Sequence, residues 1–256
     1  MSDDNEIDDS KAPLLEHLIE LRRRLLFSVL TVVAAFIICY FFAEEIFAFL
    51  VQPLVHAGQK RIIFTQIFEA FFVRVKVAFF AGLMVSFPII ANQLWKFVAP
   101  GLYRKEKRAL LPFLFATPIL FLLGAAMAYF VAVPLSLKFL LSYQGNMGGI
   151  EQDALPSVGN YLSFVMQFLF AFGLAFLLPI FMMLVERAGL VTRAQFVSAR
   201  RYAIVGIFAV SAILTPPDIG SQFLLAVPLI LLYELGMIGI WFTEKKRREA
   251  SDASAA

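Results

Sequence analysis

The chain has little of what soluble enzymes, disulfide-rich scaffolds and nucleic-acid-binding proteins depend on. Of its 256 residues only 16% are charged, two are histidines and one, Cys39, is a cysteine. A soluble domain of average composition carries about 25% charged residues, so this chain lacks the polar surface to cover itself in water. A single cysteine excludes an intrachain disulfide framework. A net charge of +3 is too small for the basic surface of a nucleic-acid-binding protein, so no nucleic-acid partner is expected.

Catalytic patterns are also missing from the sequence. It contains no HExxH zinc motif, no Gly-x-Ser-x-Gly nucleophile elbow and no glycine-rich phosphate loop. These absences predict that the protein is not an enzyme and that it holds no metal ion and no cofactor.

Apolar residues are what the chain has in excess, at 61% of the sequence with 29 phenylalanines. A helix needs ~20 mostly apolar residues to cross the ~30 Å hydrocarbon core of a bilayer. Five stretches reach about this length and a sixth, residues 202–216, is shorter, so we expect an all-α polytopic membrane protein with six spans in one transmembrane domain over residues 14–243. The six expected spans cover residues 25–43, 72–95, 109–135, 159–185, 202–216 and 220–242. Residues 1–13 are expected to form a disordered acidic tail, and residues 244–256 a basic, disordered one.

Prolines inside the spans predict kinked helices and a curved bundle. They are Pro88, Pro112, Pro118, Pro134, Pro179 and Pro228. Two further prolines, Pro216 and Pro217, end the fifth helix because they remove backbone donors. The last two helices are therefore expected to be short. At ~24 Å the fifth would be shorter than the bilayer core, which predicts a thinned bilayer or a partner helix beside it.

Basic residues mark one side of the membrane. Of the 22 lysines and arginines, 17 fall in the two tails and in the second and fourth loops, which alternate with loops that hold the other five. Because basic loops stay in the cytoplasm, both termini are expected there. The first apolar run is too long for a cleavable signal peptide and no A-x-A site follows it, so no cleavage is expected.

The segment over residues 14–24 predicts an amphipathic helix ahead of the first span. One face holds Leu14, Leu18, Leu21 and Leu25, and the other holds His17, Glu20 and Arg24. Glu20 and Arg24 are also spaced as an i,i+4 ion pair in the favourable order. Two interpretations stay open: an interfacial helix with its arginines on lipid phosphates, or a cytoplasmic docking face that offers a carboxylate.

Two other acids are unusual in their surroundings. Glu106 is the one acid among four bases in residues 100–108. It is either a local counter-ion or a receptor for an incoming guanidinium, since arginine pairs with a carboxylate at two points. Glu234 is the sixth span's only charge within its apolar run. It reaches the interface, makes a polar contact between helices, or forms a proton-sensitive site.

Three segments resemble the TatC family, the multispanning subunits of the twin-arginine protein translocase. They are HLIELRRRL at residues 17–25, QLWKFVAPGLYRKE at residues 93–106 and LTPPD at residues 214–218. Shorter matches are FEAF at residues 68–71, AYF at residues 128–130 and YLSF at residues 161–164. Their order and spacing agree with the family from about residue 14 to residue 242.

The resemblance implies a receptor and core scaffold that exports folded proteins across the bacterial cytoplasmic (inner) membrane with the proton motive force. The implied partners are twin-arginine signal peptides, the single-span TatB and TatA proteins, the lipid bilayer and further copies of the chain in a receptor complex. Glu20 and Glu106 would receive the signal arginines, flanked by Arg22, Phe97, Pro100, Tyr103 and Arg104. Partner helices would dock at Thr215, Asp218, Gln222 and Glu234.

One position departs from the family pattern. Many members place a glutamate or glutamine before the proline of the fourth span, and this chain has Leu177 there. The alternative to a translocase receptor is a proton-coupled secondary transporter, which needs a polar site at the bilayer midplane and usually an internal repeat. The sequence offers Glu234 for such a site and shows no repeat.

Overall fold

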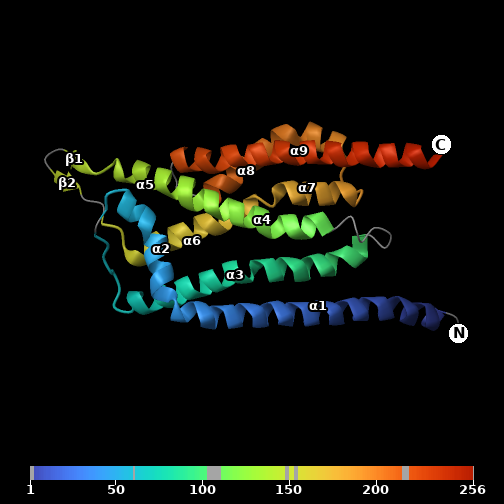
Figure 1. Ribbon diagram of the computed structural model, residues 1–256, viewed down its shortest axis with the longest axis horizontal. Coiled ribbons are helices and arrows are strands. Elements are labelled where there is room, and N and C mark those ends of the chain that lie inside the picture. Colours follow the sequence, from blue (N-terminus) through green and yellow to red (C-terminus); the bar gives the residue numbers. More distant parts are fainter. Residues whose placement is uncertain are drawn as a thin grey trace. The chain divides into compact units, whose positions relative to one another are not determined.

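The computed structural model describes residues 3–59, 61–102, 111–147, 150–152, 155–214 and 219–255, and most of these residues are helical (Figure 1). Within these ranges six helical segments are long and apolar enough to cross a membrane. They are Leu18–Phe41, Glu69–Phe97, Phe113–Leu141, Val158–Arg187, Arg193–Ile213 and Gln222–Lys245. The prediction of a six-span, helical membrane protein is confirmed.

The chain divides into two compact units, one made of Met1–Phe47 with Arg74–Pro118 and the other of Ala48–Val73 with Ile119–Ala256. The first unit contains α1 (Asp3–Phe41), the start of α2 (Ala43–His56), most of α3 (Glu69–Leu102) and the start of α4 (Leu111–Met127). The second contains the rest of α2 and α4, then the π-helical turn η2 (Ala128–Ala132), α5 (Val133–Leu141), α6 (Val158–Ala175), α7 (Leu178–Arg187), α8 (Arg193–Leu214) and α9 (Ile219–Ala255).

In the first unit, α1 and α3 lie side by side because small residues let their backbones approach (Figure 1). A side-chain carbon added at Gly82 would lie 2.8 Å from the backbone nitrogen of Phe36. Cys39, Ala43 and Ala78 form a buried cluster close to this contact. Small residues are common where helices pack in a membrane. Lipid tails are as apolar as the side chains, so close packing of the helices takes the place of the hydrophobic effect.

Helix α2 lies between the first two expected spans, and two tyrosines hold the part of it that belongs to the second unit. Pro53 has no backbone N–H, so the carbonyl of Phe49 lacks its usual helical donor. The hydroxyl of Tyr129 donates to that carbonyl at 2.7 Å, and its ring stacks on the Phe49 ring at 4.3 Å. The hydroxyl of Tyr161 donates to the next carbonyl along α2, that of Leu50, at 2.9 Å.

Proline interrupts two of the spans, as expected. The turn of π-helix, η2, directly precedes Pro134, and the fourth span breaks into α6 and α7 at Phe176 and Leu177, just before Pro179. Each irregularity accommodates a proline, which has no backbone N–H to donate to the preceding turn. Pro118 and Pro228, in contrast, lie inside continuous helices.

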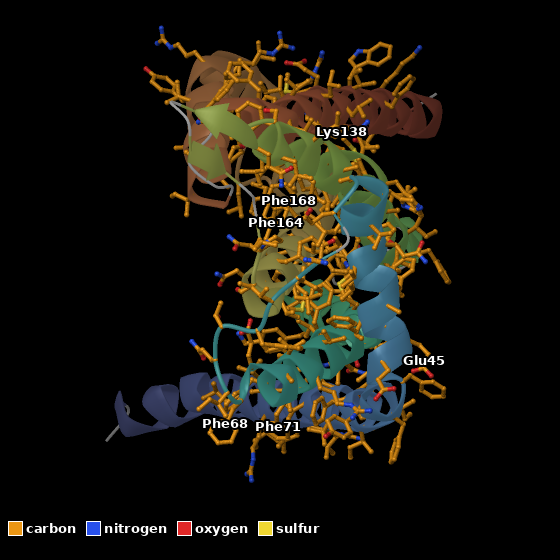
Figure 2. The ribbon with its side chains drawn as sticks, turned by 90° about the vertical axis from the view of Figure 1, so that its left-hand side faces the viewer. Glu45, Phe68, Phe71, Lys138, Phe164 and Phe168 are labelled. Atoms are coloured by element: carbon orange, nitrogen blue, oxygen red, sulfur yellow. The ribbon has the colours of Figure 1, made fainter. Side chains whose placement is uncertain are left out.

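Glycines bring α4 and α6 into close contact in the second unit. A side-chain carbon at Gly124 would lie 2.4 Å from the carbonyl oxygen of Phe172, and one at Gly173 would lie 2.6 Å from the Phe121 ring. Phe121, Phe172 and their neighbour Phe168 are fully buried. Figure 2 shows Phe168 together with Phe164 on α6, and their ring centroids are 4.4 Å apart.

The last two helices are longer than predicted. Helix α8 has 22 residues and α9 has 37, because the arginine-rich start of α8 and the basic end of α9 continue as helix. The uncharged part of α8, from Tyr202 to Leu214, is shorter than a typical membrane span. The Pro-Pro-Asp turn that was expected to join them lies outside the described residues.

The structure describes both ends of the chain as helix, with α1 beginning at Asp3 and α9 ending at Ala255, within the segments for which disordered tails are expected. The helices of the first and last spans simply continue beyond the apolar stretch. At the start of α1 this extension is favoured by its acidic composition, because a helix N-terminus favours negative charge.

A small antiparallel hairpin, which the sequence analysis did not predict, follows α5. Strands β1 (Gly145–Met147) and β2 (Ile150–Gln152) pair with Asn146 opposite Glu151. A single parallel bridge joins Ile63 to Ser157, just before α6. In Figure 1 the hairpin lies at the end of the second unit opposite the C-terminus.

Candidate functional site

A groove of about 720 Å³ is formed by α1 and α3 in the first unit, at the start of the first span. Its described lining is strongly basic, with four cationic residues and Glu20 as the one acid. The lining residues are Ile19, Glu20, Arg22, Arg23, Arg24, Leu26, Phe27, Leu30, Gln93 and Lys96. A groove with a carboxylate among bases, next to apolar side chains, is suited to a ligand that carries both charge and apolar groups.

The carboxylate of Glu20 is paired with a guanidinium. Arg24 donates from Nε to Glu20 Oε1 at 3.0 Å, and its Nη2 contacts the same oxygen. The Nη1 of Arg24 lies 3.5 Å from Oε1 of Gln93, so this arginine bridges α1 and α3. The i,i+4 pair predicted from the sequence is therefore present, whereas its link to Gln93 was not anticipated.

The other expected receptor residues lie along the same two helices or outside the described part. Arg22 is exposed and lines the groove, and Phe97 is half-buried near the end of α3. Pro100 lies in α3, but its side chain is not described. Tyr103, Arg104 and Glu106 fall outside the described residues. The structure thus brings Glu20 and Arg22 into one groove.

Two of the expected docking residues connect α8 to α9. Glu234 accepts a hydrogen bond at 2.8 Å from Nη2 of Arg200, and both side chains are about half exposed. Gln222 donates to the carbonyl of Phe208 at 3.1 Å. Of the interpretations open for Glu234, the polar contact between helices is the one that the structure contains. Thr215 and Asp218 lie outside the described residues.

A cavity of about 120 Å³ adjoins the Arg200–Glu234 pair and is lined further by Arg193, Met237, Ile238 and Trp241. On the same two helices, Tyr233 donates to the carbonyl of Phe196 at 2.7 Å and belongs to a buried cluster with Met182, Met237 and Ile240. The α8–α9 pair therefore combines an apolar core with an accessible ion pair. No group of three metal-ligating side chains is found among the residues that the structure describes.

A buried carboxylate, Glu69, was missed as a functional or structural site. Its Oε2 accepts hydrogen bonds from Thr65 N, Thr65 Oγ1 and Gln66 N, and its Oε1 accepts from Gly159 N at 2.6 Å. Glu69 thereby joins the segment before α3 to the first turn of α6. Its position in the FEAF match was the only signal, because Gly159 lies 90 residues away.

Comparisons with known proteins agree with this architecture. A family model described as Sec-independent protein translocase protein (TatC) matches residues 16–228. The Sec-independent protein translocase protein TatC of Magnetococcus marinus is 46% identical over 250 residues, which are 97% of this chain and 91% of that relative. The protein of the same name from Aquifex aeolicus is 39% identical over 239 residues, which are 92% and 98% of the two chains.

Two solved structures are similar in fold and in sequence. Both are crystal structures described as the twin arginine translocase receptor TatC, at 38% identity, with TM-scores of 0.75 and 0.77. Each match covers 87% of this chain, and 96% and 98% of the respective solved chains. The family match, the identities and the shared fold together show that the chain belongs to the TatC family of Sec-independent protein translocase proteins.

Proposed function

We propose that this chain is the receptor and core scaffold that recognises twin-arginine signal peptides and exports their folded cargo with the proton motive force. Its family consists of protein translocase components and is not a family of known enzymes. Its six apolar helices make it a multi-pass membrane protein. We place it in the bacterial inner membrane with both termini in the cytoplasm, an orientation supported by the 17 of 22 basic residues on that side.

The observation that carries this proposal is that Glu20 binds a guanidinium in an accessible groove. The Glu20 side chain is 36% exposed, and its carboxylate contacts two nitrogens of Arg24. A signal arginine presents the same chemical group, and charge-assisted pairing of this kind is among the stronger hydrogen bonds in proteins. Glu106 is proposed as the receiver of the second arginine, with Arg22, Phe97, Pro100, Tyr103 and Arg104 around the two carboxylates.

The single-span proteins TatB and TatA are proposed to dock on α8 and α9, through Thr215, Asp218, Gln222 and Glu234. Support comes from the exposed Arg200–Glu234 pair, because a half-exposed ion pair exchanges partners at little cost. Several copies of the chain are proposed to share one receptor complex.

Photo-crosslinking tests the receptor site. A photoreactive residue placed at position 20 or 106 should capture a cargo whose signal carries an arginine pair, and capture should fall when that pair is replaced by two lysines. Position 45 serves as the control, since Glu45 is an exposed acid that belongs to α2 and does not line the groove.

Matched substitutions extend the test. Glu20→Gln and Glu106→Gln should each reduce signal-peptide capture and export, whereas Glu45→Gln should leave both unchanged. Normal capture and export in both groove variants would show that the two carboxylates are not the receiving groups.

A further inference from the structure

We propose that Arg24 is a built-in competitor of the signal peptide, whose guanidinium must leave Glu20 before a signal arginine can bind there. This inference rests on the proposed receptor function of the groove. Its basis is the geometry of the pair: Nε and Nη2 of Arg24 both contact Oε1 of Glu20. The groove thus already contains the kind of contact that the incoming peptide is proposed to make.

The groove also gives Arg24 a second acceptor. Nη1 of Arg24 lies 3.5 Å from Oε1 of Gln93, on the neighbouring helix α3. When a signal arginine takes Glu20, Arg24 can turn toward Gln93 and keep a hydrogen bond. Displacement therefore exchanges one guanidinium for another at the carboxylate, and it does not leave the partly buried Arg24 without any acceptor.

A tethered competitor has a defined effect on affinity. Arg24 lies one helical turn from Glu20, so its effective concentration at the carboxylate is high even after displacement. It lowers the affinity of every peptide that has to displace it, and it recaptures Glu20 as soon as the signal arginine separates. We therefore expect Arg24 to speed peptide release, as a receptor that passes its cargo onward requires.

The neighbouring Arg23 provides a matched control for charge. It lines the same groove and is exposed, whereas the two guanidinium contacts to Oε1 of Glu20 come from Arg24. Arg23→Gln and Arg24→Gln remove the same positive charge from the groove. Only Arg24→Gln also removes the competitor, so the difference between the two variants isolates competition from general electrostatics.

The test measures binding of a fluorescent synthetic signal peptide to the full chain in phospholipid nanodiscs, with an arginine-pair peptide and its lysine-pair twin. Arg24→Gln should bind the arginine peptide about two- to five-fold more tightly than Arg23→Gln does, the range expected from a modest ion pair. The gain should appear mainly as slower dissociation. In a Glu20→Gln background the two arginine variants should bind alike.

Arg24→Lys gives a second reading that keeps the charge of the groove. An ammonium lacks the planar fork of a guanidinium, so this variant should bind with an affinity between those of the wild type and Arg24→Gln. If Arg24→Gln does not fold, Arg24→Lys can still be compared with Arg23→Gln to test the inference. The unfolding midpoint of each variant is measured in parallel, because a purely structural role for Arg24 would lower stability and would not raise affinity.

The outcomes separate this inference from the receptor proposal. If the wild type prefers the arginine peptide and depends on Glu20, while Arg24→Gln or Arg24→Lys shows no gain over Arg23→Gln, Arg24 is not a competitor. If instead the wild type binds both peptides equally and Glu20→Gln has no effect, the receptor function of the groove is itself wrong.

Discussion

Single buried polar side chains hold the segments of the second unit together. Glu69 is 7% exposed, and its two oxygens accept four hydrogen bonds from Thr65, Gln66 and Gly159. All four donors are satisfied by one carboxylate because an ionised Glu offers only acceptors. The segment before α3 and the start of α6 therefore depend on the charge of this one residue.

Glu69→Gln tests that dependence. An amide has one oxygen in place of two, so its NH₂ group would face donors, and the protein should unfold several degrees lower in detergent. Glu45→Gln is the matched control: Glu45 is an exposed acid (Figure 2), and its loss should leave the unfolding midpoint nearly unchanged. Equal midpoints for the two variants would mean that the Glu69 contacts contribute nothing to stability.

Tyr129 and Pro53 form a compensating pair. The proline leaves the carbonyl of Phe49 without a helical donor, and the tyrosine hydroxyl supplies one at 2.7 Å. Tyr129→Phe should therefore destabilise the protein by about 1–3 kcal/mol, the cost of a buried acceptor without a partner.

A double-mutant cycle checks the explanation for Tyr129. Pro53→Ala restores a backbone N–H to the Phe49 carbonyl, so Tyr129→Phe should cost less in that background than in the wild type. Chemical unfolding of the four proteins gives the coupling. If the cost of Tyr129→Phe is the same in both backgrounds, the hydroxyl does not act by replacing the missing donor.

At the level of elements, two glycines determine how closely α4 and α6 approach. Gly124→Ala would place a carbon 2.4 Å from the Phe172 carbonyl oxygen, which is backbone and cannot turn aside. We expect this overpacking to cost about 1–3 kcal/mol. The loss should appear as a lower unfolding midpoint in detergent.

Gly206→Ala, in α8, is the contrasting substitution. Nothing lies within 4 Å of a side-chain carbon built there. Alanine should therefore stabilise the helix by up to about 1 kcal/mol through its higher propensity. A Gly124→Ala protein that is as stable as Gly206→Ala would show that α4 and α6 do not pack as closely as the structure indicates.

The spans were predictable from the sequence, whereas their ends were not. An apolar stretch of about 20 residues predicts a membrane helix from length alone, and all six were found. Polar residues continue a helix as readily as they end it, so α1, α8 and α9 extend beyond the expected limits. Helix α2 did carry a signal, with Glu44 and Glu45 in its first turn and apolar residues spaced along one face.

The candidate site was predictable only where it is local. The i,i+4 spacing predicted the Glu20–Arg24 pair, because helical geometry fixes which residues face each other. The bonds from Arg24 to Gln93 and from Gly159 to Glu69 join residues 69 and 90 positions apart. Such contacts depend on how helices pack, and no periodicity within one segment reports them.

For the whole molecule, the positions of its few charged residues are expected to determine how the chain is oriented in the membrane. The tails and loops assigned to the cytoplasmic side hold 17 basic residues. They alternate along the sequence with loops that hold the other five basic residues. Each pair of consecutive loops thus favours the same orientation, and positive charge near the ends of spans is what retains a loop in the cytoplasm. The two tails and the α7–α8 loop should therefore lie on one side, and the loop after α2 and the segment after α5 on the other.

Cysteine labelling tests this orientation, and the chain is well suited to it because Cys39, its one cysteine, is buried. In a Cys39→Ala background, His56→Cys and Tyr143→Cys should react with a membrane-impermeant maleimide in intact spheroplasts. Leu190→Cys and Ala253→Cys should react only after the membrane is permeabilised, which also controls for accessibility. Reaction of Leu190→Cys or Ala253→Cys in intact spheroplasts would place the basic loops outside, and the groove at Glu20 would then face away from newly made cargo.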